Sequence, residues 1–329
     1  MAAKPAVTRS TAKPRSVAKP AANGSAAKPA AASAARPATP QPRTPAAPAP
    51  AAPASAPDFG DILSPTSATA RTAVADRELV LVVSDLVKRF GDTLAVNHAS
   101  FAVPAGTIFG IVGPNGAGKT TTLSMVTGLL RPDGGSASVH GADVWADPAG
   151  AKKAMGVLPD RLRLFDRLTG SQMLHYAGTL RGLDSRTVKK RSTDLAAAFG
   201  LDDALGRLVS DYSAGMTKKI ALASAMIHSP RLLVLDEPFE SVDPVSAANV
   251  TAILQRYVEA GGTVVLSSHS MDLVQRICDL VAIVVSGQVL ASGTMDTVRG
   301  TGSLEERFLE LAGGPKSVEG LEWLHSFSD

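Results

Sequence analysis

The sequence predicts an α/β domain that follows a long arm with no core of its own. From residue 78 onward, short runs of β-branched and apolar residues alternate with longer stretches in which apolar residues recur every three or four positions. This is the pattern of strands alternating with amphipathic helices. Several of the short runs are apolar throughout, as parallel strands buried on both faces are. One of them leads directly into a glycine-rich loop.

The expected elements follow from these patterns. The apolar runs predict strands over residues 79–83, 100–103, 107–112, 137–140, 232–235, 263–267, 281–285 and 288–291. The helical spacing predicts helices over 120–130, 171–180, 186–199, 203–208, 217–227 and 303–311. Because the pattern is mostly helical between about 149 and 227, we interpret that segment as a helical insertion in a sheet domain. The chain is then divided into an arm at 1–77, a domain at 78–314 and a C-terminal tail at 315–329.

The arm differs from the rest of the chain in composition. Residues 1–57 contain 22 Ala and 12 Pro, and large apolar residues are too sparse up to residue 77 to offset an ordering cost of roughly 1 to 2 kcal/mol per residue. We therefore predict a disordered arm. Residues 1–57 also hold eight of the 33 Lys and Arg and none of the 30 Asp and Glu. The remaining chain is mildly acidic, so the overall basicity does not indicate a nucleic-acid partner.

The sequence has no stretch near the roughly 18 to 20 consecutive apolar residues of a membrane-spanning helix. Its N-terminus lacks the unbroken apolar segment of a secretory signal. The single Cys278 cannot form an internal disulfide, which is typical of a reducing compartment. We therefore expect a cytoplasmic location.

The strand expected at 107–112 runs into a loop that matches the spacing G-x-x-x-x-G-K-[ST] and is followed by an expected helix, as that motif requires. Its glycines let the backbone wrap a polyphosphate closely. Lys119 supplies a positive charge for the β and γ phosphates of ATP, and the Thr120 hydroxyl suits Mg²⁺. The alternative, a glycine-rich turn that contains Lys-Thr by coincidence, leaves the eight-residue match unexplained. The candidate ATP-binding residues are Gly113, Pro114, Asn115, Gly116, Ala117, Gly118, Lys119, Thr120 and the adjoining Thr121.

Two adjacent carboxylates, Asp236 and Glu237, follow the apolar run at 232–235. Strand ends that face a phosphate loop are where such sheets place ligands, and neighbouring strand residues point to opposite sides. We therefore expect Asp236 to serve Mg²⁺ and Glu237 to orient and deprotonate the water that attacks the γ-phosphate. Taken alone, the pair also fits an ordinary solvated strand end. His269 follows the next strand and is a candidate sensor of the γ-phosphate, although a lone histidine is more often structural.

A segment ahead of the helix at 217–227 narrows the class of protein. Tyr212-Ser-Ala-Gly-Met216 resembles the LSGGQ signature of ABC ATPases. The resemblance implies that Ser213 and Gly215 bind the γ-phosphate held by an opposite subunit, a role for which a helix N-terminus is suited. Without the resemblance, Ser-x-Gly before a helix is simply an N-cap.

Other positions match the ABC pattern in order. By this resemblance Phe90 stacks on adenine, Asp243 lies in the D-loop and His269 is the H-loop histidine. The resemblance covers roughly 79–311. It implies a P-loop NTPase core sheet with an antiparallel β part, and it makes 149–227 the helical subdomain.

Two departures from the family pattern stand out. Asp160 takes the place of the usual Q-loop Gln, which puts its contacts with the metal and its coupling to a membrane partner in doubt. Ala214 and Met216 replace a Gly and a Gln of the signature. We expect altered contacts there rather than lost function, because Ala is acceptable at the start of a helix.

The resemblance implies an ATP-hydrolysing transporter subunit, and residues 164–170 and 302–312 are similar to bacterial drug, polysaccharide and lipid exporters. Each motif occurs once, so we expect a homo- or heterodimer around two ATP·Mg²⁺. A separate membrane-spanning subunit would hold it at the inner face of the cell membrane. Two rivals stay open: a soluble ABC ATPase of translation or DNA repair, and a regulatory partner that binds nucleotide without hydrolysing it. The arm is either an inert tail or a contact for anionic lipid.

Overall fold

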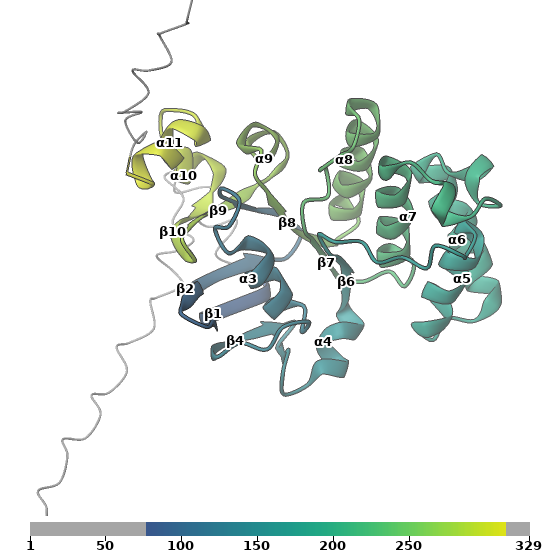
Figure 1. Cartoon of the computed structure of the whole chain (residues 1–329), viewed down its shortest axis with the longest axis horizontal. Coiled ribbons are helices and arrows are strands. Elements are labelled where there is room, and N and C mark those ends of the chain that lie inside the picture. Colours follow the sequence, from purple (N-terminus) through teal and green to yellow (C-terminus); the bar gives the residue numbers. More distant parts are fainter. Residues whose placement is uncertain (1–76, 314–329) are drawn as a thin grey trace, which may run out of the picture. The chain divides into compact units, whose positions relative to one another are not determined.

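The structure, a computed structural model, describes residues 77–313. The predicted arm, apart from Arg77, and the predicted tail at 315–329 lie outside the described residues, so the division of the chain into arm, domain and tail stays a prediction. Within the described part, strands and helices form two sheets with helices packed around them (Figure 1). The α/β fold class is confirmed.

The larger sheet has six strands in the order β10-β9-β3-β8-β7-β6. Within it β10 pairs antiparallel with β9, and the other neighbouring pairs are parallel. Every residue of β3, β7 and β8 is buried, which explains why these strands read as continuous apolar runs. The strands are β3 Ile108–Val112, β6 Met155–Leu158, β7 Leu232–Leu235, β8 Thr263–Ser268, β9 Leu280–Val285 and β10 Gln288–Thr294.

The smaller sheet is antiparallel, with the order β2-β1-β4-β5, and it is the antiparallel part that the ABC resemblance implied. The strand expected at 79–83 continues to residue 90, because a bulge at Asp85 (φ +54°) breaks the alternation but not the pairing with β2. The strands are β1 Leu79–Phe90, β2 Thr93–Pro104, β4 Gly134–Val139 and β5 Ala142–Asp143.

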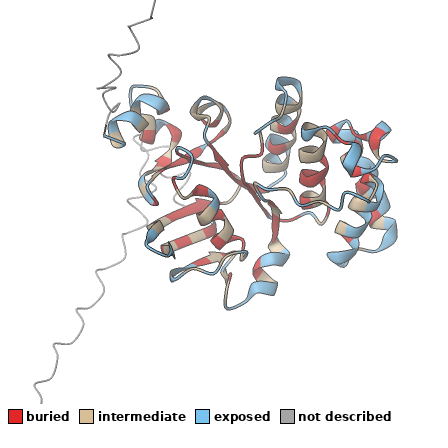
Figure 2. Cartoon of the chain, viewed as in Figure 1, coloured by how far each residue is buried: buried red, intermediate tan, exposed pale blue. Residues whose placement is uncertain are grey.

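Alternate side chains of the central strands enter two separate cores. In β3, Ile108 and Val112 join the core formed with the helices that follow β6, whereas Phe109 and Ile111 join the core shared with the smaller sheet. This alternation is the two-residue period of a strand. Phe101 of β2 stacks on Phe109 with ring centroids 5.5 Å apart, which ties the two sheets together. Figure 2 shows the buried residues gathered in the sheets and on the inner sides of the helices.

Three helices lie between β6 and β7 and group together in Figure 1: α5 Gly170–Leu180, α6 Ser185–Phe199 and α7 Ala214–Met226. Each begins at a side-chain cap, from Thr169, Asp184 and Ser213 respectively. No helix among residues 77–313 combines the length and the apolar character needed to cross a membrane. The other helices are α3 Lys119–Val126, α4 Pro148–Ala154, α8 Pro244–Glu259, α9 Met271–Ile277, α10 Met295–Arg299 and α11 Leu304–Leu311.

Three sequence predictions about helices need correction. The helix expected at 203–208 is wrong: only Asp202–Ala204 forms a 3-10 turn. The Ala204 carbonyl accepts from the Arg207 amide at 2.9 Å and from the Tyr212 hydroxyl at 2.7 Å, and Leu208 pairs with Thr169 in an isolated β-bridge instead of continuing a helix. The helix expected at 120–130 ends at Val126, shortly before Gly128 with φ +68°. The segment from about 149 begins with α4 and β6, and β6 belongs to the larger sheet.

Candidate active site

The glycine-rich loop connects the end of β3 to the start of α3, which places its backbone amides at a helix N-terminus. Gly116 and Gly118 have φ of +82° and +100°, a left-handed conformation that glycine adopts without strain. A Cβ at Gly113 would collide with the backbone carbonyl of Val284, and one at Gly118 with that of Ala95. The shape of the loop therefore requires glycine at these positions.

Lys119, the first residue of α3, folds its buried side chain back over this loop. Its ammonium donates to the Gly113 carbonyl at 2.8 Å and to the Pro114 carbonyl at 3.3 Å. The same nitrogen lies 3.5 Å from Glu237 Oε1. The loop cation and the second carboxylate of the acid pair therefore face each other.

Asp236 follows β7 and is buried. Its Oδ1 accepts a hydrogen bond of 2.5 Å from the Ser267 hydroxyl, and the Thr120 hydroxyl also hydrogen-bonds to this carboxylate. Burial raises the pKa of Asp236 above its ordinary value, the hydrogen bonds oppose that rise, and the negative charges of Asp160 and Glu237 reinforce it. Asp236 is thus joined directly to the phosphate loop through Thr120.

Glu237 points toward different partners from Asp236, as neighbouring positions at a strand end allow. Its Oε2 lies 3.0 Å from His269 Nδ1, and its amide donates to the Ser267 hydroxyl at 2.9 Å. Its backbone has φ +46°, a left-handed conformation that residues other than glycine rarely adopt. The carboxylate is therefore held between Lys119 and His269 by a constrained backbone.

Lys119, Glu237 and His269 line a cavity of about 340 Å³. The lining also includes loop residues 115–121 and Asp160. Asp236 lies outside this lining and borders an adjacent cavity of about 360 Å³, to which Thr120 and Asp160 also contribute. The lining residues of the first cavity are Ala95, Asn115, Gly116, Ala117, Gly118, Lys119, Thr120, Thr121, Asp160, Glu237, Glu240 and His269.

Besides Asp236 and the loop residues Gly113 and Pro114, four predicted residues do not line this cavity. Phe90 ends β1 and is 52% exposed, and Lys88 Nζ lies 5.7 Å from its ring centroid. Ser213 caps α7 by accepting from the Met216 amide at 3.3 Å. Asp243 caps α8 in the same way, and its hydrogen bonds to the first turn lower its pKa.

Gly215 is the fourth of these residues outside the cavity. A Cβ added at Gly215 would lie 3.8 Å from Asp243 Oδ2, so the signature segment and the D-loop segment are neighbours within one chain. Ser213 and Asp243 are exposed caps of α7 and α8, and neither they nor Gly215 line the phosphate-loop cavity.

Sequence reasoning missed three polar contacts at the site. Ser267 bridges both members of the acid pair, and Glu240 lines the cavity. Lys218 of α7 donates to the Glu237 backbone carbonyl, and burial lowers its pKa against the opposing effect of nearby carboxylates. The available signal for Ser267 was a pair of serines at the end of the apolar run of β8, whereas the spacing of Lys218 and Glu240 carries none.

A metal ion here would depend on oxygen donors. Thr120, Asp236 and Asp160 approach one another at the two adjoining cavities. Within residues 77–313 no group of three or more His, Cys, Asp or Glu side chains could hold a metal ion by itself. The donor set therefore suits a hard cation that takes its remaining ligands from a phosphate or from water.

A parallel sheet with a glycine-rich phosphate loop after β3 and an acid pair after β7 defines a P-loop nucleotide-binding domain. The pattern of the ABC transporter family matches residues 96–240. The ABC transporter ATP-binding protein NatA of Bacillus subtilis (strain 168) is 37% identical over 224 residues, which cover 67% of this chain and 91% of that protein. The chain belongs to the ABC transporter family of ATP-binding proteins.

Two further relatives support this assignment. The daunorubicin/doxorubicin resistance ATP-binding protein DrrA of Streptomyces peucetius is 40% identical over 211 residues, or 64% of each chain, so this chain spans just under two thirds of that relative's length. A solved ATP-binding subunit of an ABC transporter has a TM-score of 0.67 and 28% identity, and the match covers 71% of this chain and 99% of that one. The resemblance to ABC ATP-binding proteins is confirmed.

Proposed function

We propose that this chain binds and hydrolyses ATP and that, as one of two ATP-binding subunits, it drives a separate membrane-spanning subunit of an exporter. One observation carries the proposal. Lys119, Glu237 and His269 come from three different parts of the chain and converge on one cavity beside the phosphate loop. Membership of the ABC transporter family supports the same activity.

ATP binding relies on the loop and on the edge of the smaller sheet. The loop amides and Lys119 receive the β and γ phosphates, and the positive end of α3 adds to their attraction. The exposed ring of Phe90 stacks on adenine. This role is compatible with its place in the β1–β2 hairpin, because Ala95 of β2 lines the phosphate cavity.

The magnesium ion that accompanies ATP fits the donors described above. Mg²⁺ prefers oxygen ligands and is commonly held by one or two carboxylates together with substrate phosphates. Thr120 and Asp236 would hold it, with Asp160 as a third oxygen donor. When bound, the ion neutralises negative charge on the phosphates during transfer.

Glu237 acts on the attacking water. Its carboxylate is buried, and the contact with His269 Nδ1 fixes its direction, so it can orient a water molecule and accept its proton. Because His269 uses Nδ1 for this contact, Nε2 is the ring nitrogen that can meet the γ-phosphate. Lys119 stays within reach of both the phosphates and Glu237.

Two chains are needed for a complete site. Ser213, Gly215 and Asp243 are absent from the lining of the chain's own phosphate cavity, and a helix N-terminus such as that of α7 is suited to bind an anion. In a head-to-tail dimer this helix end would meet the γ-phosphate held by the other chain. The second chain is either another copy or a related ATP-binding subunit.

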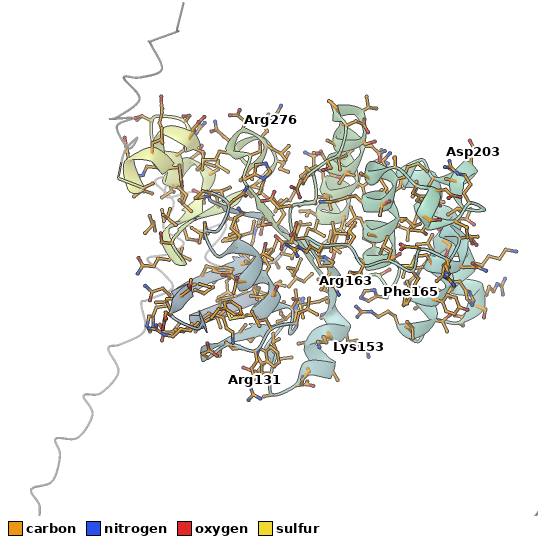
Figure 3. The ribbon with its side chains drawn as sticks, in the orientation of Figure 1. Arg131, Lys153, Arg163, Phe165, Asp203 and Arg276 are labelled. Atoms are coloured by element: carbon orange, nitrogen blue, oxygen red, sulfur yellow. The ribbon has the colours of Figure 1, made fainter. Side chains whose placement is uncertain are left out.

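A groove beside α5 is the proposed contact for the membrane-spanning subunit. It is a cavity of about 270 Å³ lined mostly by apolar side chains, among them Leu162, Leu164 and Met173. Phe165 and Leu180 are 66% and 82% exposed, and Figure 3 shows Phe165 near Arg163 on the connection that leads from β6 to α5. A cytoplasmic segment of the membrane subunit would cover these apolar groups and hold the chain at the inner face of the cell membrane.

The test is Glu237→Gln, which keeps the shape of the side chain and removes its basicity. Phosphate release by the purified full chain should slow by roughly 10² to 10⁴, while a fluorescent ATP analogue should bind as tightly as before. Glu259→Gln, at the exposed end of α8, is the matched control. Unchanged turnover in Glu237→Gln would remove Glu237 from the role of base.

Two departures from the family pattern favour a second candidate function. Asp160 occupies the Q-loop position and faces the phosphate cavity with its negative charge, and Ala214 alters the signature, which together fit a nucleotide-binding partner that regulates a heterodimer. ATPase activity measured for the chain alone, and then together with its membrane partner, separates the two functions. Absence of hydrolysis in both states would favour the regulatory partner.

Contact between the arm and anionic lipid stays a proposal, since the arm lies outside the described residues. Polybasic segments gain on the order of 1 kcal/mol per cation close to an anionic surface, and residues 1–57 carry eight cations and no acid. Sedimentation of the isolated arm with anionic vesicles tests the idea. No binding at physiological salt would show that the arm is an inert tail.

A further inference from the structure

Lys218 connects the helical part of the structure to the acid pair. It lies on the second turn of α7, in the helix that Ser213 caps, and its side chain is half-buried. Its ammonium donates a hydrogen bond to the backbone carbonyl of Glu237. Four carboxylates act on this cation electrostatically: Glu240, Asp160, Glu237 and Asp236.

The hydrogen bond matters because the Glu237 backbone is constrained. Its φ of +46° is a conformation that persists only where neighbouring groups hold it. The Ser267 hydroxyl holds the amide, His269 holds the carboxylate, and the carbonyl accepts from Lys218 and from the Glu240 amide, the latter at 3.2 Å. Among these contacts Lys218 is the one that comes from α7.

We propose that Lys218 is a positioning residue for ATP hydrolysis. By holding the Glu237 carbonyl, it keeps this residue in the left-handed conformation that directs the carboxylate between Lys119 and His269. The inference rests on the proposed role of Glu237 as the base. It also gives α7 two tasks, because the N-terminus of this helix would meet the γ-phosphate of a second chain while its second turn positions the base of its own chain.

The experiment compares Lys218→Met with Lys218→Arg in the full chain. Methionine fills a similar volume but removes both the donor and the charge, whereas arginine keeps both. Misplacing a general base should lower kcat for phosphate release by roughly 10- to 100-fold in Lys218→Met, with KM and the affinity for a fluorescent ATP analogue within about twofold of wild type. Lys218→Arg should recover most of the lost turnover.

Lys190→Met, on the exposed side of α6, is the matched control, because it removes the same charge from the same group of helices and should turn over ATP like the wild type. Thermal melting followed by circular dichroism shows whether each variant is folded. If Lys218→Met does not fold, Lys218→Gln takes its place. Its side chain is one bond shorter, so it too should lose turnover, and wild-type turnover in it overturns the proposal.

Measuring Glu237→Gln and the double variant that combines it with Lys218→Met distinguishes a failure of the proposed base from a failure of the proposed role of Lys218. If Lys218 acts through Glu237, Lys218→Met should add no further loss in the Glu237→Gln background. Unchanged turnover in Glu237→Gln would sink the proposed base and this inference with it. Slow turnover in Glu237→Gln combined with wild-type kcat in folded Lys218→Met would overturn the role of Lys218 alone.

Discussion

Ser267→Ala is the sharpest test of how the acid pair is held. Ser267 is fully buried at the end of β8. Its hydroxyl donates to Asp236 Oδ1 at 2.5 Å and accepts from the Glu237 amide at 2.9 Å. A single substitution therefore removes one hydrogen bond from each member of the pair and leaves both groups buried.

The expected loss of stability follows from these two bonds. A hydrogen bond to a charged group contributes about 1.5 to 3 kcal/mol net, and a buried donor left without a partner costs about 1 to 3 kcal/mol. Because both bonds use one hydroxyl, their contributions overlap. We expect Ser267→Ala to lower the free energy of unfolding by about 2 to 4 kcal/mol and to slow ATP hydrolysis by disturbing Glu237.

The measurement is equilibrium unfolding in urea, followed by far-UV circular dichroism. The change in the free energy of unfolding is read from the shift of the urea midpoint, with the dependence of that free energy on urea concentration unchanged. Ser268→Ala is the matched control, since Ser268 is also buried but its hydroxyl, within residues 77–313, accepts only from the nearby Ser270 amide, at 3.0 Å. It should lose about 1 kcal/mol. If Ser267→Ala loses no more than Ser268→Ala, the bridge between the two acids does not stabilise the site.

Two further predictions concern Asp236 and Ser213. Burial is the main cause that raises the pKa of Asp236 above 3.8, because the folded state disfavours the ionised carboxylate. The corresponding stability is therefore present below pH 3.8 and is lost as the pH rises through the folded pKa. Asp236→Asn should therefore be more stable than wild type at neutral pH, with the difference shrinking on acidification, and urea midpoints that differ equally at every pH would contradict this. Ser213→Ala removes the cap of α7, worth about 1 kcal/mol, and should also weaken ATP-dependent dimerisation of the Glu237→Gln chain in light scattering. An unchanged dimer would exclude Ser213 from the interface.

The fold was predictable where burial is continuous. The run at 232–235 coincides with β7 because all four residues are buried, and the helices α5 and α6 follow their apolar spacing closely. The edge strand β6 was not predicted, because it lies in a segment whose pattern is mostly helical and its residues Met155-Gly-Val-Leu158 follow α4 directly. The helix α8 was not anticipated, and within it Val250 and Leu254 are the buried residues, which makes its apolar face narrow.

The site was predictable in part for a similar reason. The phosphate loop and the acid pair each occupy consecutive positions, so their patterns stand in the sequence itself. Ser267, Lys218 and Glu240 belong to no such pattern, and their contacts depend on which segments pack together. The positive φ of Glu237 was equally hidden, because glutamate does not favour that conformation.

The sequence by itself determined the phosphate loop, since the left-handed turns of such a loop depend on glycine at particular neighbouring positions. It also determined the strands that are apolar throughout. Only the tertiary structure decided that Lys119, Glu237 and His269 meet, because β8 follows β7 in the chain yet lies between β3 and β7 in the sheet. That order is a property of strand pairing between distant segments, and it brings the ends of three strands to one edge where a cation, a carboxylate and an imidazole come within reach of each other.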